Sequence, residues 1–283
     1  MRAIQSPSPG SLYLIGTPIG NLEDITLRAL RILREADLVA CEDTRQTQKL
    51  LNHFEIQART TSYHEHNEMT KGPELVLRLE EGARVALVTD AGMPSISDPG
   101  YRLVELCLRH NIPVVPVPGA SAVVASLIAS GLPTHAFQFL GFAPPKKNLR
   151  RKFLEQMRQY PATSIFFEAP HRITETLADI LEVLGDRPAV VAREITKLHE
   201  EFLRGACSAV LATLRRRERL QGEITVLIGA APEPVAPPVA AQSVKERVTE
   251  LIRQQNLSRM EALKAVARER NISKSQAYRE YQT

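Results

Sequence analysis

Cysteine is scarce in this chain of 283 residues, and long apolar runs are missing. The three cysteines, Cys41, Cys107 and Cys207, are odd in number, widely spaced and set among apolar residues. This pattern predicts buried thiols in a reducing compartment, and it argues against a disulfide framework or a thiolate metal site. No apolar stretch approaches membrane-spanning length, and no secretory signal follows Met1. We therefore expect a cytoplasmic protein that does not enter a membrane.

Several motifs that bind phosphates or support nucleophilic catalysis are also absent. The chain contains no G-x-G-x-x-G fingerprint, no Walker loop and no G-x-S-x-G elbow. Binding of a dinucleotide or a nucleoside triphosphate, and serine hydrolysis, are thus poorly supported. His64-Glu65-His66 has no third ligand at a recognisable spacing, so we assign no metal site.

Charge of one sign is in small excess, and that excess lies in the C-terminal segment. The net charge is +4, and residues 243–283 carry nine Lys or Arg against five Asp or Glu. The rest of the chain is therefore nearly balanced. A basic segment of this kind suits a polyanion such as RNA, although a solvated helical face explains it about equally well.

Short apolar runs alternate with helical patterns as far as about residue 135. The runs most typical of buried strands are Leu12–Ile15, Leu38–Cys41, Val85–Thr89 and Val114–Val117, with a weaker one at Arg59–Tyr63. This alternation predicts a mostly parallel α/β sheet, in an N-terminal domain that spans residues 11–136.

The unit from Val85 to Ser121 is the most informative part of this domain. The strand Val85–Thr89 ends at Asp90-Ala91-Gly92, and the strand Val114–Val117 ends at Pro118-Gly119-Ala120-Ser121. Pro99 suits the first turn of the helix between them. We expect two adjacent parallel strands whose small-residue loops meet at the edge where open α/β sheets bind ligands.

Two other loops follow strands of the same domain. Gly16-Thr17-Pro18-Ile19-Gly20-Asn21 would let the main chain approach a ligand closely, and an ordinary strand-to-helix turn is the alternative. Glu42-Asp43-Thr44-Arg45 could orient a substrate or accept a proton. Its alternative is a helix start capped by Asp43 or Thr44.

Residues 137–230 are typical of a second, α+β domain with some antiparallel strands. The strand Ser164–Phe167 ends at Glu168-Ala169-Pro170-His171-Arg172, and the strand Ala189–Ala192 ends at Arg193-Glu194-Ile195-Thr196-Lys197. A last strand is expected at Glu223–Ile228. The two charged clusters predict a cleft between the domains, with helix capping and surface ion pairs as the alternative.

A Pro/Ala linker at 231–242 precedes a basic module at 243–283. Three capping boxes, Ser243-x-x-Glu246, Ser258-x-x-Glu261 and Ser273-x-x-Gln276, each predict the start of a short helix. The expected apolar positions are Val244, Val248, Leu251, Met260, Leu263, Val266, Ala277, Tyr278 and Tyr281. The last part resembles a helix-turn-helix that exposes Lys274 and Arg279. A packing module without a nucleic-acid role is an equal alternative.

Seven short sequence motifs follow one another along the chain: YLIGTPIGN, CEDTR, VTDAGMPSISDPG, VPGAS, FLGF, FFEAPHR and AREITKLHEE. Over residues 11 to 230 they resemble the tetrapyrrole methylase superfamily, and more closely its branch that methylates ribosomal RNA of the small subunit. The basic C-terminal module also fits that branch. The tetrapyrrole-methylating members carry a G-D-P order, whereas this chain has Asp90-Ala91-Gly92-Met93-Pro94, which argues against a porphyrin-type substrate.

The resemblance implies two α/β domains that hold S-adenosylmethionine in the cleft between them, usually in a homodimer. It implies methyl transfer to the ribose 2′-oxygen of a cytidine in the decoding region of 16S ribosomal RNA. The positions that match the family's cofactor contacts are Pro18, Asp90, Ala91, Gly92, Ile96, Ser121, Ala122, Glu168, Ala169 and Ile195.

Four charged residues are candidates for the chemistry of such a transfer. Asp43 or Glu42 could accept the proton of the ribose hydroxyl, which is a weak acid. Arg45 or Lys197 could stabilise developing charge or hold a phosphate. Two alternatives remain: a methyltransferase for a tetrapyrrole-like small molecule, and a non-catalytic ribosome-assembly factor that retains the cofactor pocket.

Overall fold

The computed structural model of this chain describes residues 10–158, 160–230, 243–255, 257–270 and 272–282. The chain divides into two compact units, Met1–Ala231 and Pro232–Thr283. The predicted linker at 231–242 lies outside the described residues. Within the described ranges, no helix combines the length and apolar character needed to cross a membrane.

Five parallel strands form the N-terminal sheet, in the order β3-β2-β4-β1-β5. They are β1 (Leu12–Ile15), β2 (Leu38–Cys41), β3 (Thr60–Ser62), β4 (Val85–Val88) and β5 (Val114–Val117). The predicted strands are confirmed, but β4 and β5 are not adjacent. The central strand β1 separates them, because Leu12 pairs with Val85 on one side and with Val114 on the other. Three loops therefore converge at the carboxyl edge between β4 and β5.

Helices cover both faces of the N-terminal sheet, because successive strand residues point to opposite sides. Leu87 packs in the cluster with α3 (Glu68–Glu80) and α4 (Tyr101–Arg109). Its neighbour Val88 packs in the cluster with α1 (Leu27–Glu35) and α2 (Thr44–His53). A short 3-10 helix, η1 (Leu22–Asp24), precedes α1. The three cysteines are buried and free, which confirms the prediction of buried thiols.

The start of α4 differs from the prediction, since Pro99 lies outside the helix. Gly100 caps α4 with a φ of 146°, a backbone conformation that a helical turn cannot contain. The helix can therefore begin only at Tyr101.

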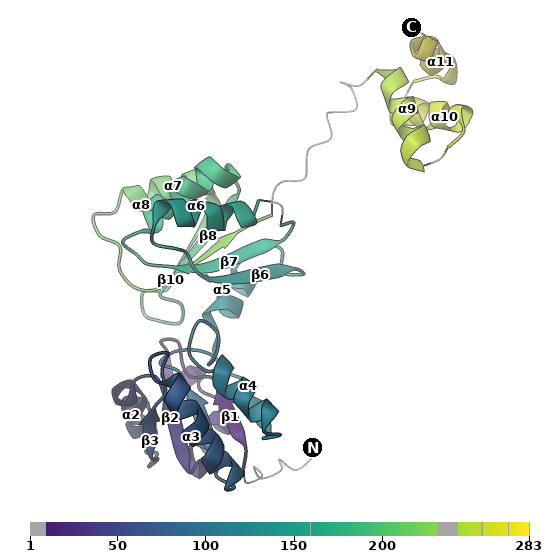
Figure 1. The fold of residues 1–283 in the computed structure, drawn as a ribbon. Helices are drawn as coiled ribbons and strands as arrows, with labels where there is room; N and C mark the ends of the chain where they lie inside the picture. Colours follow the sequence, from purple (N-terminus) through teal and green to yellow (C-terminus); the bar gives the residue numbers. More distant parts are fainter. Residues whose placement is uncertain (1–9, 159, 231–242, 256, 271, 283) are drawn as a thin grey trace. The chain divides into compact units, whose positions relative to one another are not determined.

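The helix α5 (Ala122–Ser130) follows the loop after β5 but packs on the second sheet. Its Val123 and Leu127 lie in one apolar cluster with Ile165 and Leu227 of that sheet. Figure 1 shows α5 directly beneath the second sheet. This helix thereby connects the carboxyl edge of the N-terminal sheet to the second sheet.

The second sheet is mixed, as predicted, in the order β6-β7-β10-β8-β9. It contains β6 (Phe137–Phe142), β7 (Thr163–Glu168), β8 (Pro188–Arg193), β9 (Glu201–Ala206) and β10 (Ile224–Ile228), of which only β6 and β7 pair in parallel. Both edge strands escaped the prediction. The segment of β6 was expected only as the start of the second domain, and β9 has no apolar run because it mixes exposed charges with a glycine. The predicted fold class, a parallel α/β domain followed by a mixed-sheet domain and a helical module, is confirmed.

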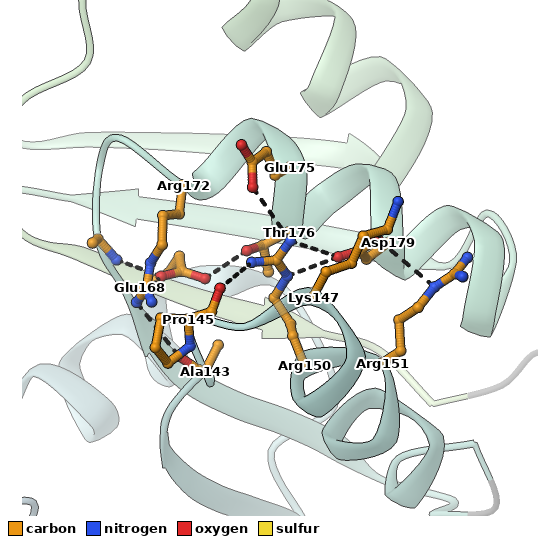
Figure 2. Close-up of polar contacts among 11 residues, drawn as sticks. Ala143, Pro145, Lys147, Arg150, Arg151, Glu168, Arg172, Glu175, Thr176 and Asp179 are labelled. Atoms are coloured by element: carbon orange, nitrogen blue, oxygen red, sulfur yellow. Dashed lines mark hydrogen bonds and ion pairs between the residues drawn. The ribbon is translucent and has the colours of Figure 1, made fainter.

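Three helices cover the face of the second sheet that α5 leaves free (Figure 1). They are α6 (Lys147–Gln156), α7 (Ile173–Leu184) and α8 (Cys207–Arg215). A charge is buried between α6 and α7, since only 1% of Arg150 is exposed. Its guanidinium pairs with Asp179 at 2.7 Å, and it also donates to the Pro145 carbonyl (Figure 2). A buried charge is tolerated only with such partners.

The C-terminal unit contains three helices, as predicted: α9 (Val244–Gln255), α10 (Arg259–Glu269) and α11 (Lys274–Gln282). Ser258 and Glu261 form a complete capping box, and Ser243 and Glu246 exchange the same two hydrogen bonds. Most expected apolar positions are buried in one cluster, but Met260 and Tyr278 are 57% and 39% exposed. Helices this short bury only one narrow row of side chains, which Leu263, Val266 and Ala277 occupy in α10 and α11.

Candidate functional site

A cavity of about 410 Å³ opens where the carboxyl edge of the N-terminal sheet faces the second sheet. Its wall consists of Ile19 and Phe142 with residues 90–93, 96–98, 121–123, 167–170 and 222–225. The volume lies in the range that small-molecule sites occupy. Loops after β1, β4 and β5 supply one side of this wall, and the ends of β6, β7 and β10 supply the other.

Eight of the ten predicted cofactor contacts lie on this wall: Asp90, Ala91, Gly92, Ile96, Ser121, Ala122, Glu168 and Ala169. The other two, Pro18 and Ile195, do not line it. Pro18 is buried one position before Ile19, which does line the cavity. Ile195 is buried in the same apolar cluster as the wall residue Ile19.

Main-chain contacts hold the three loops of the N-terminal sheet together. Thr17 and Gly92 exchange two backbone hydrogen bonds of 2.9 and 3.1 Å, which join the loops after β1 and β4. A Cβ on Gly16 would lie 2.7 Å from the Gly119 Cα, so the loops after β1 and β5 are in direct backbone contact. The close approach that we expected between the glycine turn and a ligand is therefore made at Gly16 with another loop.

The loop after β4 is strained where it borders the cavity. Ser95 and Ser97 have φ values of 71° and 62°, in the left-handed region that residues other than glycine rarely adopt. Between them, Ile96 is 48% exposed and lies on the cavity wall. Strain of this kind persists where the surrounding structure holds it, and it is concentrated at functional sites.

The start of α5 offers hydrogen-bond donors to the cavity. Ser121 caps this helix, and its hydroxyl accepts a bond from the Val124 amide at 3.4 Å. The amides of Ala122 and Val123 also belong to the first turn, where no carbonyl within the helix can accept from them. Both residues lie on the wall, so this end of the cavity suits an anionic group such as a carboxylate.

On the opposite wall, the carboxylate of Glu168 is buried and fully engaged. Arg172 pairs with it at 2.6 Å, the Thr176 hydroxyl donates at 2.5 Å, and the Ala169 amide donates at 2.7 Å (Figure 2). Only 2% of the residue is exposed. The sequence left open a surface ion pair at this position, but the ion pair of Glu168 is buried. It fixes the loop that carries Ala169 and Pro170 along the cavity.

Asp98 is an acidic wall residue that our sequence reasoning missed. Its pKa is raised to about 6, chiefly by burial and also by repulsion from Glu42 and Asp90, while a hydrogen bond with Thr89 acts in the opposite direction. Burial also raises the pKa values of Asp90 and Glu42. The carboxyls of Asp98, Asp90 and Glu42 interact electrostatically and form one acidic corner of the site. The only signal in the sequence was the position of Asp98 within the motif VTDAGMPSISDPG, because its neighbours come from other loops.

The residues after β2 lie beside this corner but outside the cavity wall. Asp43 caps α2, as the structural alternative predicted, with its carboxylate accepting from the Arg45 amide at 2.8 Å. It also pairs with the Arg45 guanidinium at 3.0 Å, and these hydrogen bonds lower the pKa of Asp43. The Asp43 amide donates to the Asp90 carboxylate at 3.3 Å, which connects this loop to the cavity.

Lys197 lies on the side of the second sheet. Its ammonium pairs with Glu194 at 2.9 Å and with the wall residue Glu223 at 3.3 Å. The lysine side chain runs over Gly20, where a Cβ would lie 2.4 Å from the Lys197 Cγ. Across the described residues, Lys197 shares no hydrogen bond or ion pair with Glu42, Asp43 or Arg45, so the structure does not bring the four candidates into one contact.

The model of the family Tetrapyrrole (Corrin/Porphyrin) Methylases matches residues 11–211, which contain both sides of the cavity up to α8. The chain belongs to this family. A ribosomal RNA small subunit methyltransferase I from Halalkalibacterium halodurans is 48% identical over 280 residues, 98% of this chain and 96% of that protein. The chain therefore also belongs to that group, and the resemblance inferred from its motifs is confirmed.

Two further comparisons bear on this methylase-family chain. A ribosomal RNA small subunit methyltransferase I from Thermotoga maritima is 49% identical over 219 residues, which are 98% of that protein but only 77% of this chain. A diphthine synthase structure covers 77% of this chain and 89% of its own, with a TM-score of 0.62 and 17% identity. At that identity the likeness establishes the fold alone.

Proposed function

We propose that this protein is an S-adenosylmethionine-dependent methyltransferase that methylates the ribose 2′-hydroxyl of a decoding-region cytidine in 16S ribosomal RNA. The observation that carries the proposal is the cavity between the two sheets, whose wall includes eight positions assigned to the cofactor from the family's motifs. The names of the full-length relatives support RNA of the small ribosomal subunit as the acceptor.

The cavity wall fits the chemical parts of S-adenosylmethionine. Ile19, Phe142 and Phe167 offer apolar surfaces for a purine ring. The free amides at the start of α5 suit the carboxylate of the methionine part. The carboxylate of Asp90 on the same wall would attract the positively charged sulfonium and ammonium groups.

The bound cofactor supplies a methyl group made electrophilic by its sulfonium, so the residues of the chain have to align the ribose oxygen and remove its proton. Among the acidic candidates, Asp98 combines a position on the wall with a raised pKa. The raised pKa makes Asp98 a stronger base than an ordinary carboxylate, and Asp98 is still ionised at neutral pH. Glu42, which repels Asp98, also has a raised pKa, mainly because of burial. Asp43 is held by Arg45 and is the weaker base of the three.

A labelled-methyl transfer assay tests this function directly. The full-length protein is incubated with labelled S-adenosylmethionine and, separately, with small ribosomal subunits, free 16S RNA and a porphyrinogen. We expect label in RNA, in a nucleotide linkage that resists alkaline hydrolysis because its 2′-oxygen is blocked. Label only in the porphyrinogen would favour the tetrapyrrole alternative, and cofactor binding without any transfer would favour the assembly-factor alternative.

The candidate roles are tested with the variants Asp98→Asn, Asp43→Asn and Lys197→Ala. We expect Asp98→Asn to lose at least tenfold in transfer rate, in the range of a lost general base, and the other two to lose less. Glu81→Gln, at an exposed position after α3, serves as the control. A variant that binds cofactor and keeps the full rate removes its residue from the mechanism.

For the C-terminal unit we propose docking to RNA, because the excess positive charge lies there and Lys274 is exposed. Truncation after Ala230 should weaken binding to the small subunit and flatten its salt dependence, while cofactor affinity stays unchanged. Equal RNA affinity of the truncated and full chains would defeat this role. We also propose that the protein is a homodimer, which light scattering of the purified protein tests. We further propose that it is located in the cytoplasm.

A further inference from the structure

A second hollow lies next to the cofactor cavity, on the side of the second sheet. This groove has a volume of about 760 Å³, and its two sides are formed by the start of α7 and by the segment between α8 and β10. Pro170 and Gly222 line both the groove and the cofactor cavity, so the two hollows meet at these residues. An RNA strand with one nucleotide at the cofactor cavity therefore has this groove as an adjoining surface.

The groove is lined by arginines in excess of acids. Arg215, Arg217 and Arg219 line it, against a single acidic residue, Glu218. Arg217 is engaged, because its guanidinium forms two hydrogen bonds with Glu201 of β9. Arg215 and Arg219 are exposed, and neither forms an ion pair with any carboxylate of the described residues. The groove therefore holds two guanidinium groups whose charge is not neutralised.

The cations on α6 show the opposite arrangement on the same unit. Lys147, Arg150 and Arg151 all lie within 4 Å of Asp179 (Figure 2). Arg151 also pairs with Glu182. These ion pairs join α6 to α7. Arg215 and Arg219, by contrast, form no ion pair with a described carboxylate, and both lie in the groove that adjoins the cavity.

The T. maritima relative indicates that an acceptor contact is needed outside the C-terminal unit. The matched 219 residues cover 98% of that protein, and a match that includes the whole family region 11–211 can extend only about 20 residues beyond it. Such a match cannot reach into Pro232–Thr283. That protein, which is named for methylation of ribosomal RNA, is about 60 residues shorter than this chain, so we expect it to hold its acceptor without a full counterpart of the C-terminal unit.

We propose that the groove between α7 and the α8–β10 segment binds the phosphate backbone of the RNA strand next to the methylated nucleotide, through Arg215 and Arg219. This inference rests on the proposed function and adds the site that holds the substrate strand. Guanidinium groups suit phosphate because they donate several hydrogen bonds in a fixed plane. Contacts of this kind position a strand without reading its sequence.

The test compares the double variant Arg215→Gln/Arg219→Gln with the wild type, both as the full chain. The probe is an RNA hairpin with the decoding-region sequence, and its binding is measured by fluorescence anisotropy across a series of salt concentrations. We expect about tenfold weaker binding and a salt slope reduced by about 1.5, as the loss of two phosphate contacts dictates. In the transfer assay, KM for the small subunit should rise by a similar factor, with kcat and cofactor affinity within about twofold of wild type.

The control is Arg28→Gln/Lys152→Gln, which removes the same charge from two exposed positions on α1 and α6. If the groove variant binds the hairpin like this control, or if the wild type does not bind the hairpin, the groove proposal is wrong. Weaker binding to assembled subunits with unchanged hairpin binding would also overturn it, in favour of a ribosomal-protein contact. The proposed function fails separately, when the wild type binds RNA and cofactor but transfers no methyl group.

Discussion

The two sheets build opposite walls of one cavity by different physical means. On the N-terminal side, main-chain contacts between small residues hold the loops, as between Gly16 and Gly119 and between Thr17 and Gly92. On the side of the second sheet, buried ion pairs hold the frame, as between Glu168 and Arg172.

This difference follows from the topology of each sheet. Parallel strands bring several loops to one carboxyl edge, where only glycine permits the backbones to touch. The mixed second sheet carries three helices on one face, and its buried charges fix how those helices pack. We therefore expect substitutions that add a Cβ to damage cofactor binding, and substitutions that remove a charge to damage stability.

The largest effect on stability is expected from Arg150→Met. The change leaves Asp179 buried without its closest partner, which should cost about 3 kcal/mol in free energy of unfolding. Urea denaturation measures this loss, and cofactor affinity should stay within about twofold because neither residue lines the cavity. Lys152→Met, at an exposed position of α6, should cost under about 0.5 kcal/mol. If Arg150→Met/Asp179→Leu is no more stable than the single variant, the unpaired charge is not the cause.

Gly16→Ala should break the N-terminal wall. The new Cβ would lie 2.7 Å from the Gly119 Cα, so the two loops have to separate, at a cost of about 2–3 kcal/mol. Isothermal titration calorimetry should show cofactor affinity lowered at least tenfold. Gly131→Ala is the control, because it meets backbone strain at a φ of 79° but has no atom within 4 Å of the new Cβ. Equal loss of cofactor affinity in both variants would contradict the role of the loop contact.

Asp98→Asn removes a charge from the N-terminal wall while it keeps the size of the side chain, so it isolates the effect of that charge on the free energy of unfolding. The folded-state pKa of about 6 lies above the ordinary value of 3.8, so ionisation of Asp98 destabilises the fold as the pH rises through 6. The variant should be more stable than wild type by about 1 kcal/mol near pH 8, allowing for solvent screening of a partly exposed carboxyl, and equal to it near pH 4. Denaturation across pH measures this difference, and a constant difference would reject the assigned cause. The wild-type transfer rate should also fall below about pH 6.

Arg217→Gln should have the smallest effect, because Glu201 keeps a second partner in Arg193 at 3.2 Å. The hydrogen bonds from Arg217 lower the pKa of Glu201 from its ordinary value of 4.5. The stability they contribute is therefore present above that value and disappears as the pH falls through the lowered pKa. We expect a loss of about 0.5–1 kcal/mol near pH 7, measured by urea denaturation, against no loss for Arg215→Gln. A loss that persists at about pH 2 would point to packing.

The strands that were predicted from the sequence are those whose signal is local. Val85–Val88 and Leu38–Cys41 are buried on both faces, so every residue has to be apolar. The edge strand Glu201–Ala206 shows no such run, because one side of it faces solvent. The motifs also located much of the cavity wall, since their small-residue loops follow directly after strands.

The sequence by itself determined the fold class, the buried thiols and the family, and it offered Asp43 or Thr44 as the cap of α2. Each of these rests on neighbours within a few residues or on an ordered set of motifs. Only the tertiary structure decided that β1 separates β4 from β5, that Asp98 joins Glu42 and Asp90, and that Gly16 touches Gly119. These relations join residues distant in the chain, whose spacing depends on how the strands are ordered and not on any local pattern.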